Sequence, residues 1–253
     1  MAFESLLNPV LNPLLEFLGY FWTLMILVFV ITMIITLIYK YTTNQSLMKD
    51  LKAELKAFQK QIKELKDQPE KAMGVQKKMM QTNSKYMMHS FKPMLFTFLP
   101  IIIFFGWMSA HLGYYPLLPG EEFSVTMDFN EGVNGEVELV LPDLEVMNGL
   151  TQTIQAGQVK WVLEGEVGEY QLNYKFNDDI YSNVVLISDE KNYKLPVTKI
   201  KKDGVKSITV SNKKVQPLTV LPIPWINNFG WLGTYILFSI MFSILIRKLL
   251  KVY

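Results

Sequence analysis

Three long apolar runs divide the chain. Residues 17–39 carry no charged side chain, and neither do residues 93–120. A third uncharged run, 215–246, is rich in Pro and Asn in its first third. A helix needs about 20 apolar residues to cross the hydrocarbon core of a bilayer. The pattern therefore predicts three transmembrane helices, over residues 18–39, 94–113 and 229–247.

Residues 1–17 have a different, amphipathic pattern. Apolar side chains recur at helical spacing from Phe3 to Leu14, while Glu4, Asn8 and Asn12 occupy the other face. This pattern is typical of a segment that lies in the membrane interface. The alternative is a simple extension of the first transmembrane helix.

Residues 45–68 follow a heptad pattern, which is typical of a helix with an apolar seam. The apolar positions step by three and four residues, at Met48, Leu51, Leu55, Phe58, Ile62 and Leu65. Pro69 is expected to end this helix, because proline disfavours helix in the residue before it. A second helical stretch, about 70–91, follows. The sequence thus predicts an antiparallel coiled-coil hairpin within residues 40–92.

Residues 121–222 read as strands. Seven short runs alternate apolar and polar residues, and clusters of Gly, Asn and Asp separate them. The runs are FSVTMDF, EVELVL, VKWVLEG, YQLNYKF, NVVLIS, SITVS and PLTVL. This pattern predicts an all-β, sandwich-like domain within residues 114–228, with a barrel as the alternative. The chain has no cysteine, so an apolar core must hold this domain together.

Charge predicts the topology of the whole chain. Residues 40–92 hold 12 Lys against 5 acids, whereas residues 114–228 hold 10 Lys against 16 acids. Basic loops stay in the cytoplasm. We therefore expect a multi-pass protein of the cell membrane, mainly α-helical, with its N-terminus outside. The hairpin and the tail, 248–253, are then cytoplasmic, and the β-domain is extracytoplasmic.

No pattern of an enzyme is present. The two histidines, His89 and His111, are expected on opposite sides of the membrane, so they cannot share a metal or a catalytic triad. The sequence has no Gly-rich phosphate loop, no HExxH and no Gly-x-Ser-x-Gly motif. We expect no catalytic residue, no metal and no cofactor.

Polar residues recur in the cytoplasmic half of each predicted span. They are Thr32, Thr36 and Lys40 in the first, Thr97 in the second, and Ser239, Ser243 and Arg247 in the third. Each hydroxyl alone can simply bond to a carbonyl of its own helix. Together, the seven residues predict a hydrophilic groove that opens to the cytoplasm and is closed to the outside.

Methionine gathers where the hairpin meets the second span. Six of the fourteen methionines fall within residues 73–94. Methionine is flexible and polarizable, so such a surface adapts to many apolar partners. We predict that Met79, Met80, Met87, Met88 and Met94 contact substrate. Alternatively, they fill the hairpin seam against Leu51, Phe58 and Ile62.

The lysines of the hairpin predict an anionic partner, either ribosomal RNA or anionic lipid headgroups. The residues are Lys52, Lys56, Lys60, Lys63, Lys66, Lys71, Lys77 and Lys78. No aromatic residues are interleaved to stack on bases, so recognition of base sequence is not expected. The alternative is that these lysines only satisfy the positive-inside rule.

The order of these parts, and the stretch from Lys77 to Met108, resembles the YidC-type membrane insertases, in particular their three-span archaeal branch. The resemblance is carried by Lys77, Lys78, Met79, Met80, Lys85, Pro93, Leu99 and Pro100. Two departures are clear. Bacterial members have five core spans, and many relatives place an arginine in the first span, whereas the only arginine here is Arg247.

The resemblance implies an insertase or chaperone that moves ribosome-delivered hydrophobic segments into the bilayer through the groove, without nucleotide. Its implied partners are nascent membrane proteins, the ribosome, the lipid bilayer and the Sec translocon, with no small-molecule substrate. One alternative is a membrane-anchored scaffold or binding protein that works through its β-domain. Another is a subunit of a channel or transporter, but the outer halves of the spans are more uniformly apolar than a channel requires.

Overall fold

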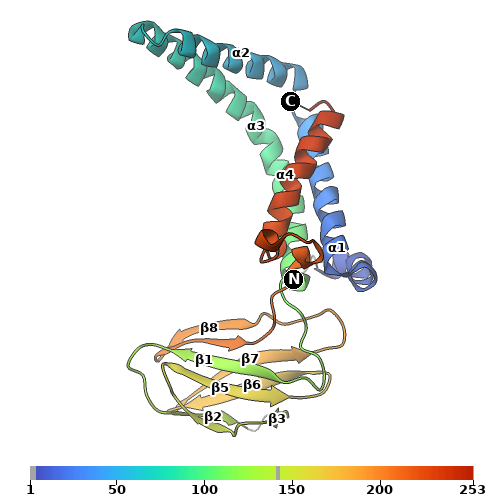
Figure 1. Ribbon diagram of the computed structural model, residues 1–253, viewed down its shortest axis with the longest axis vertical. Helices are drawn as coiled ribbons and strands as arrows, with labels where there is room; N and C mark the ends of the chain where they lie inside the picture. Colours follow the sequence, from blue (N-terminus) through green and yellow to red (C-terminus); the bar gives the residue numbers. More distant parts are fainter. Residues whose placement is uncertain (1–3, 141–142, 253) are drawn as a thin grey trace. The chain divides into compact units, whose positions relative to one another are not determined.

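The computed structural model describes residues 4–140 and 143–252, which form two compact units (Figure 1). The helical unit comprises residues 22–106 and 232–252, and the β-unit comprises residues 4–21 and 107–231. Four α-helices lie in the described residues. They are α1 Glu4–Thr42, α2 Gln45–Glu64, α3 Pro69–His111 and α4 Trp231–Leu249.

Three of these helices are long and apolar enough to cross a membrane. The segments are Leu6–Thr42, Pro93–His111 and Trp231–Leu249. The prediction of three candidate spans together with a separate β-domain is therefore confirmed. The second helix ends two residues earlier than predicted, at His111, and the third begins two residues later, at Trp231.

Helix α1 is kinked at Gly19. There φ is 73° and ψ is 179°, a conformation that residues with a side chain rarely adopt. Before the kink, Leu11 and Leu15 are buried, whereas Leu6, Val10 and Phe17 are 72%, 68% and 88% exposed. The first turns of α1 therefore leave one apolar stripe uncovered by the described residues.

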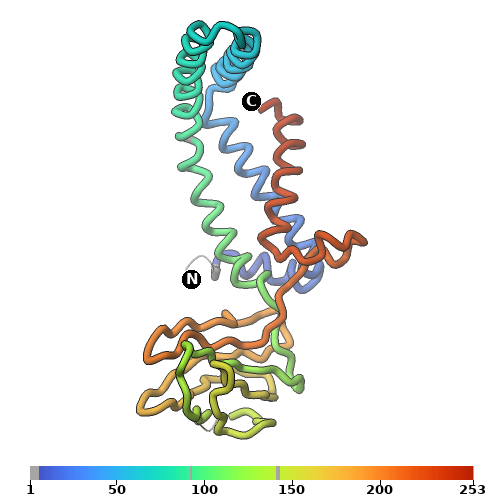
Figure 2. Tube along the Cα trace, turned by 60° about the vertical axis from the view of Figure 1, so that its left-hand side comes forward, coloured from blue at the N-terminus to red at the C-terminus, as the bar shows by residue number. Residues whose placement is uncertain are grey.

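Helix α2 and the start of α3 form a helical arm, residues 45–91, in which the chain turns back at residues 65–68 (Figures 1 and 2). Asn44 caps α2 by accepting a hydrogen bond from the Leu47 amide. Met48 and Leu51 of α2 are buried, as is Thr82 of α3.

Two details of the arm differ from the sequence-based expectation. Helix α2 ends at Glu64, and Pro69 begins α3 rather than only terminating α2. Proline is suited to the first turn of a helix, where its missing N–H has no intrahelical partner. Helix α3 then continues without interruption through Pro93 and Pro100 for 43 residues. A continuous helix keeps most backbone groups bonded as the chain approaches the membrane.

Among the described residues, nine strands form two antiparallel sheets (Figure 1). One sheet has the order β3-β5-β1-β9-β8 and the other β4-β2-β6-β7. The strands are β1 Phe123–Phe129, β2 Glu136–Val140, β3 Glu145–Val146, β4 Thr151–Thr153, β5 Gln158–Glu164, β6 Gly168–Phe176, β7 Asp179–Ile187, β8 Val197–Lys202 and β9 Val205–Val210.

Inward side chains of both sheets share one apolar core, so the β-unit is a sandwich. Trp161 of β5 and Tyr174 of β6 are its largest fully buried members. Each satisfies its polar atom: the Trp161 Nε1 donates to the Leu150 carbonyl, and the Tyr174 hydroxyl donates to Asn183 Oδ1. Burial raises the pKa of Tyr174 above its ordinary value.

The strand prediction was wrong for one run and missed three strands. The run PLTVL is a short 3-10 helix, Pro217–Val220, because Pro217 at its first position favours a helical turn. Strands β3 and β4 are two and three residues long, too short to show alternation. Strand β8 is a lysine-rich edge strand, which lacks a clear apolar face.

A tyrosine ties the end of α3 to the β-unit. The Tyr193 hydroxyl donates to the Ser109 carbonyl at 2.6 Å and accepts from the Gly113 amide at 3.0 Å. Burial raises the pKa of Tyr193 to about 12, so this hydroxyl keeps its proton at physiological pH.

Gly113 is required for this contact. A Cβ there would lie 2.6 Å from the Tyr193 hydroxyl oxygen, closer than atoms can pack. We expect Gly113→Ala to displace the hydroxyl and to lower the free energy of unfolding by roughly 1–3 kcal/mol. Urea unfolding followed by Trp fluorescence measures this. Gly106→Ala is the matched control, because a Cβ there meets nothing within 4 Å. Equal stability of the two variants would contradict the prediction.

Candidate functional site

Helix α4 packs against both other spans of the helical unit (Figure 2). The rings of Phe242 in α4 and Phe29 in α1 meet edge to face, with their centroids 5.6 Å apart. Tyr235 in α4 meets Phe105 in α3 in the same way, at 4.7 Å. These contacts bring the polar residues of α1 and α4 into one bundle.

Three residues from three helices meet at the end of the bundle that carries Lys40. The Arg247 guanidinium carbon lies 5.0 Å from the centroid of the Tyr39 ring, a cation–π geometry. Tyr86 of α3 shares a side-chain hydrogen bond with Tyr39. Burial raises the pKa of Tyr86, and the Tyr39 side chain raises it further, while the Arg247 charge lowers it. We call this trio the basic-end cluster.

The sequence predicts Arg247 as a polar residue of the groove, but it predicts no role for either tyrosine. Tyr39 directly precedes Lys40, and Tyr86 lies among the methionines. Lys40 and the methionines belong to recognisable sequence patterns, whereas the two tyrosines do not. A contact between residues so far apart in sequence leaves no local signal. The helical arm places Tyr86 at the cluster, because α3 runs from the arm into the bundle.

Four of the five predicted hydroxyl residues donate a hydrogen bond within their own helix. Thr32 and Thr36 are buried, and their Oγ1 atoms donate to the carbonyls of Val28 and Thr32, each at 2.7 Å. Thr97 donates to the Met94 carbonyl at 2.9 Å, and Ser239 donates to the Ile236 carbonyl at 3.0 Å. Their protons are thus engaged, while each hydroxyl oxygen keeps lone pairs that can accept a hydrogen bond.

The remaining polar residues of the predicted groove are half-buried. Lys40 is near the end of α1, and Ser243 and Arg247 lie one turn apart on α4. Arg247 is brought against α1 through Tyr39. The structure therefore joins the polar ends of the first and third spans, but it records no contact between Thr97 and this group among the described side chains.

Methionines form a stripe along α3. Met73, Met80, Met87 and Met94 recur every seven residues, so they share one side of the helix. They are 70%, 65%, 61% and 58% exposed. At 1.5 Å per residue, this methionine stripe is about 30 Å long and passes from the arm into the candidate span.

The other two predicted methionines lie beside the stripe. Met88 is exposed. Met79 is half-buried, and it lies three residues before the buried Thr82, on the inner side of the arm. The alternative that methionines fill the seam therefore applies to Met79 alone. The exposed apolar side continues into the span through Phe91, Leu95, Phe98, Leu99 and Ile102.

All eight lysines that were predicted to dock an anionic partner are exposed. Lys52, Lys56, Lys60 and Lys63 lie on one face of α2 at spacings of three and four residues. Among the described residues, only Lys60 of these eight has an acidic partner, Glu64 at 3.8 Å. Their charges are available to an external anion.

Histidine and carboxylate groups form no metal site within the described part of the chain. His111 belongs to the β-unit, where its ring stacks on Trp107 with centroids 4.5 Å apart. His89 is exposed in the helical unit.

One family model matches the chain. It is described as integral membrane protein EMC3/TMCO1-like, and it matches residues 7–166, more than half of the 253 residues. The matched range contains all of α2 and α3 and the strands up to β5, and it ends before α4. No curated protein and no solved structure matches the chain.

Proposed function

The chain belongs to the EMC3/TMCO1-like family of integral membrane proteins, within the Oxa1/YidC/Alb3 insertase superfamily, and from this premise we propose that it assists the insertion of hydrophobic segments into the bilayer. We infer further that it belongs to the minimal three-span archaeal branch. In this proposal the protein moves a hydrophobic segment from water into the bilayer, and no covalent bond is made or broken.

The observation that carries this proposal is the methionine stripe on an unbroken α3. One helix presents exposed, adaptable apolar side chains from Met73 in the arm to Met94 in the candidate span. A hydrophobic client segment that contacts the arm can therefore remain on an apolar surface while it moves toward the bilayer.

The charge pattern supports the direction of transfer. From the excess of lysine in residues 40–92 we infer that the helical arm and the basic-end cluster face the cytoplasm and that the N-terminus is outside. The exposed lysines of the arm then hold a translating ribosome by its phosphate groups, and the client emerges beside the stripe. The Sec translocon is a second partner to which clients with long translocated loops pass.

The polar residues at the basic end lower the barrier for the client's hydrophilic flank. Moving an unpaired polar group into hydrocarbon costs several kcal/mol. The half-buried side chains of Lys40 and Arg247 offer hydrogen-bond and charge partners at that depth. In this proposal, water solvates the client's hydrophilic flank first, and these polar groups solvate it next.

Site-specific photo-crosslinking of ribosome–nascent-chain complexes tests this function. A crosslinker at Met87 or Thr36 is expected to capture a nascent membrane segment, whereas one at Ile240, an exposed apolar position of α4, is expected to capture lipid. Capture of lipid alone at Met87 and Thr36 would exclude the insertion mechanism. Capture of the client equally at all three positions would exclude a defined path.

A further inference from the structure

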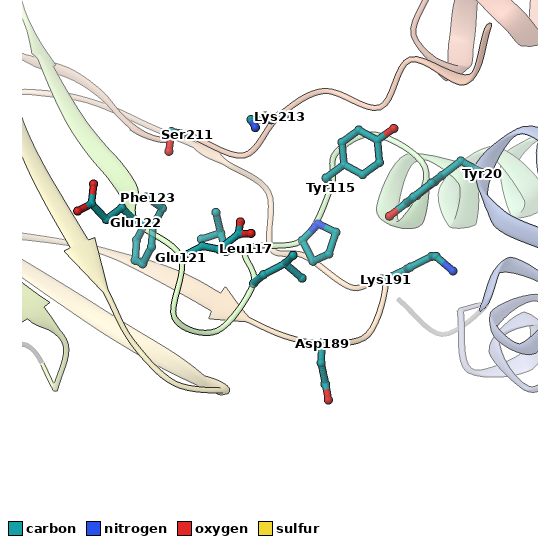
Figure 3. Close-up of a pocket in the computed structure, with 12 residues that line it drawn as sticks. Tyr20, Tyr115, Leu117, Glu121, Glu122, Phe123, Asp189, Lys191, Ser211 and Lys213 are labelled. Atoms are coloured by element: carbon teal, nitrogen blue, oxygen red, sulfur yellow. The ribbon is translucent and has the colours of Figure 1, made fainter. Parts of the chain in front are cut away.

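A pocket of about 610 Å³ lies within the β-unit, and Figure 3 shows the residues that line it. Its volume is in the range of about 300–1,000 Å³ that is usual for small-molecule sites. Four chain segments form its walls: Tyr20, the connection from α3 to β1, the residues after β7 and those after β9. The polar and aromatic lining residues are Tyr20, Tyr115, Glu121, Glu122, Asp189, Lys191, Ser211 and Lys213.

Specific contacts hold these walls in place. The Tyr115 amide donates to the Lys213 carbonyl at 2.8 Å, which fixes two wall segments beside each other. The Tyr20 and Tyr115 rings meet edge to face at 5.1 Å. Lys191 binds Glu16 through its amide, at 2.9 Å, and through its ammonium, at 3.1 Å. The pocket is therefore built by the fold and does not depend on the chance position of one long side chain.

Several polar groups of the pocket have no partner in the described structure. The Tyr20 hydroxyl oxygen is buried and makes no hydrogen bond. Lys191 is neutralised by Glu16, but no described acid pairs with Lys213. No described cation pairs with Glu121, Glu122 or Asp189 in the same lining. The pocket thus offers one available cation, one hydroxyl and three available carboxylates.

The pocket residues Tyr20 and Tyr115 lie close in sequence to the Gly19 kink of the first candidate span and to the end of the second. Tyr20 precedes the first residue of the helical unit, Trp22, by two positions, and Tyr115 follows the end of α3 by four. Tyrosine and tryptophan favour this depth, where lipid headgroups meet water. A lipid is consequently the ligand that is most concentrated near the pocket.

We propose that this pocket binds the headgroup of a zwitterionic phospholipid. Lys213 and the Tyr20 hydroxyl bind the phosphate, and Glu121, Glu122 and Asp189 attract the ammonium group. Three carboxylates against one available lysine disfavour a purely anionic headgroup. The bound lipid fastens the sandwich to the membrane surface, a property that is independent of the insertase proposal.

Native mass spectrometry of the full-length protein tests the proposal. The protein is delipidated and then offered equal amounts of phosphatidylethanolamine and phosphatidylglycerol in mixed micelles. We expect preferential retention of phosphatidylethanolamine. Tyr20→Phe and Lys213→Gln should each weaken retention, by roughly tenfold for the charged contact. Glu122→Gln should shift the preference toward phosphatidylglycerol.

Matched variants control for folding and for general lipid affinity. Tyr41→Phe removes an exposed tyrosine hydroxyl outside the pocket, and Lys214→Gln removes the lysine next to Lys213, which does not line it. Both should retain phosphatidylethanolamine like the parent. Equal retention of the two lipids, or equal effects of Lys213→Gln and Lys214→Gln, would overturn the proposal. Soluble phosphoethanolamine that binds as tightly as the lipid would overturn the assignment to a lipid.

Discussion

Replacing all four residues of the methionine stripe with glutamine is expected to reduce insertion of a single-span client at least about tenfold. Full burial of a methionine side chain contributes about 1.5–3 kcal/mol, and tenfold in affinity needs only about 1.4 kcal/mol. The exposed fractions of the four side chains range from 58% for Met94 to 70% for Met73, so a bound client can cover most of their surface. Glutamine keeps the length and helix propensity of methionine but removes its apolar character.

Insertion is measured by protease protection of a client that is synthesised in the presence of proteoliposomes. Leucine at the same four positions is the matched control, because it keeps the apolar area and loses only flexibility. We expect the leucine variant to insert a strongly hydrophobic client within about threefold of the parent, since adaptability matters most for varied clients. If the glutamine variant inserts normally, or the leucine variant fails equally, the stripe is not the client surface.

The sequence predicted the parts of this protein whose signals are local. A charge-free run of the right length identifies a candidate span, and the heptad from Met48 to Leu65 identifies α2 to within one residue of its end at Glu64. Alternation of apolar and polar residues identified the long strands of the sandwich, such as β1, in which every second residue is buried. Each of these signals depends on neighbouring residues alone.

The missed features depend on contacts between distant residues. Nothing near Tyr39 or Tyr86 indicates that they meet Arg247, which comes much later in the chain. The pocket beside Tyr20 likewise requires four segments that only the folded β-unit brings together. Strands β3 and β4 exist because they pair with longer neighbours, β5 and β2, and their own sequences are too short to specify them.

The effect of proline on a helix depends on where the proline lies in it. Pro69 lies at the start of α3, and Pro93 and Pro100 lie inside it, although all three interrupt a simple helical pattern. The sequence therefore suggested separate helices where the structure has one. This continuity changes the functional interpretation, because it makes the methionines of the arm and those of the span parts of one surface.

Substituting all eight docking lysines of the helical arm with glutamine is expected to abolish salt-sensitive binding to ribosomes. Residues 40–92 carry 12 Lys and 5 acids, so the substituted segment has more acids than lysines. Binding that neutralises phosphates weakens linearly with the logarithm of salt concentration, with a slope of about −0.7 to −0.9 per phosphate. Even three lost phosphate contacts should therefore weaken binding on the order of a hundredfold at low salt and flatten the salt dependence.

Co-sedimentation of the reconstituted protein with ribosomes, over a series of salt concentrations, measures both quantities. The control replaces Lys199, Lys201 and Lys206, exposed lysines of the β-unit, with glutamine, and it should bind ribosomes like the parent. If the arm variant still co-sediments with an unchanged slope, the lysines serve only to orient the protein in the membrane. If the arm variant instead loses affinity for ribosome-free anionic vesicles alone, the arm binds the bilayer surface and the ribosome must be held by another element. Loss of ribosome binding without loss of vesicle binding assigns the arm to the ribosome, because the same charges would then act only on phosphates that RNA presents.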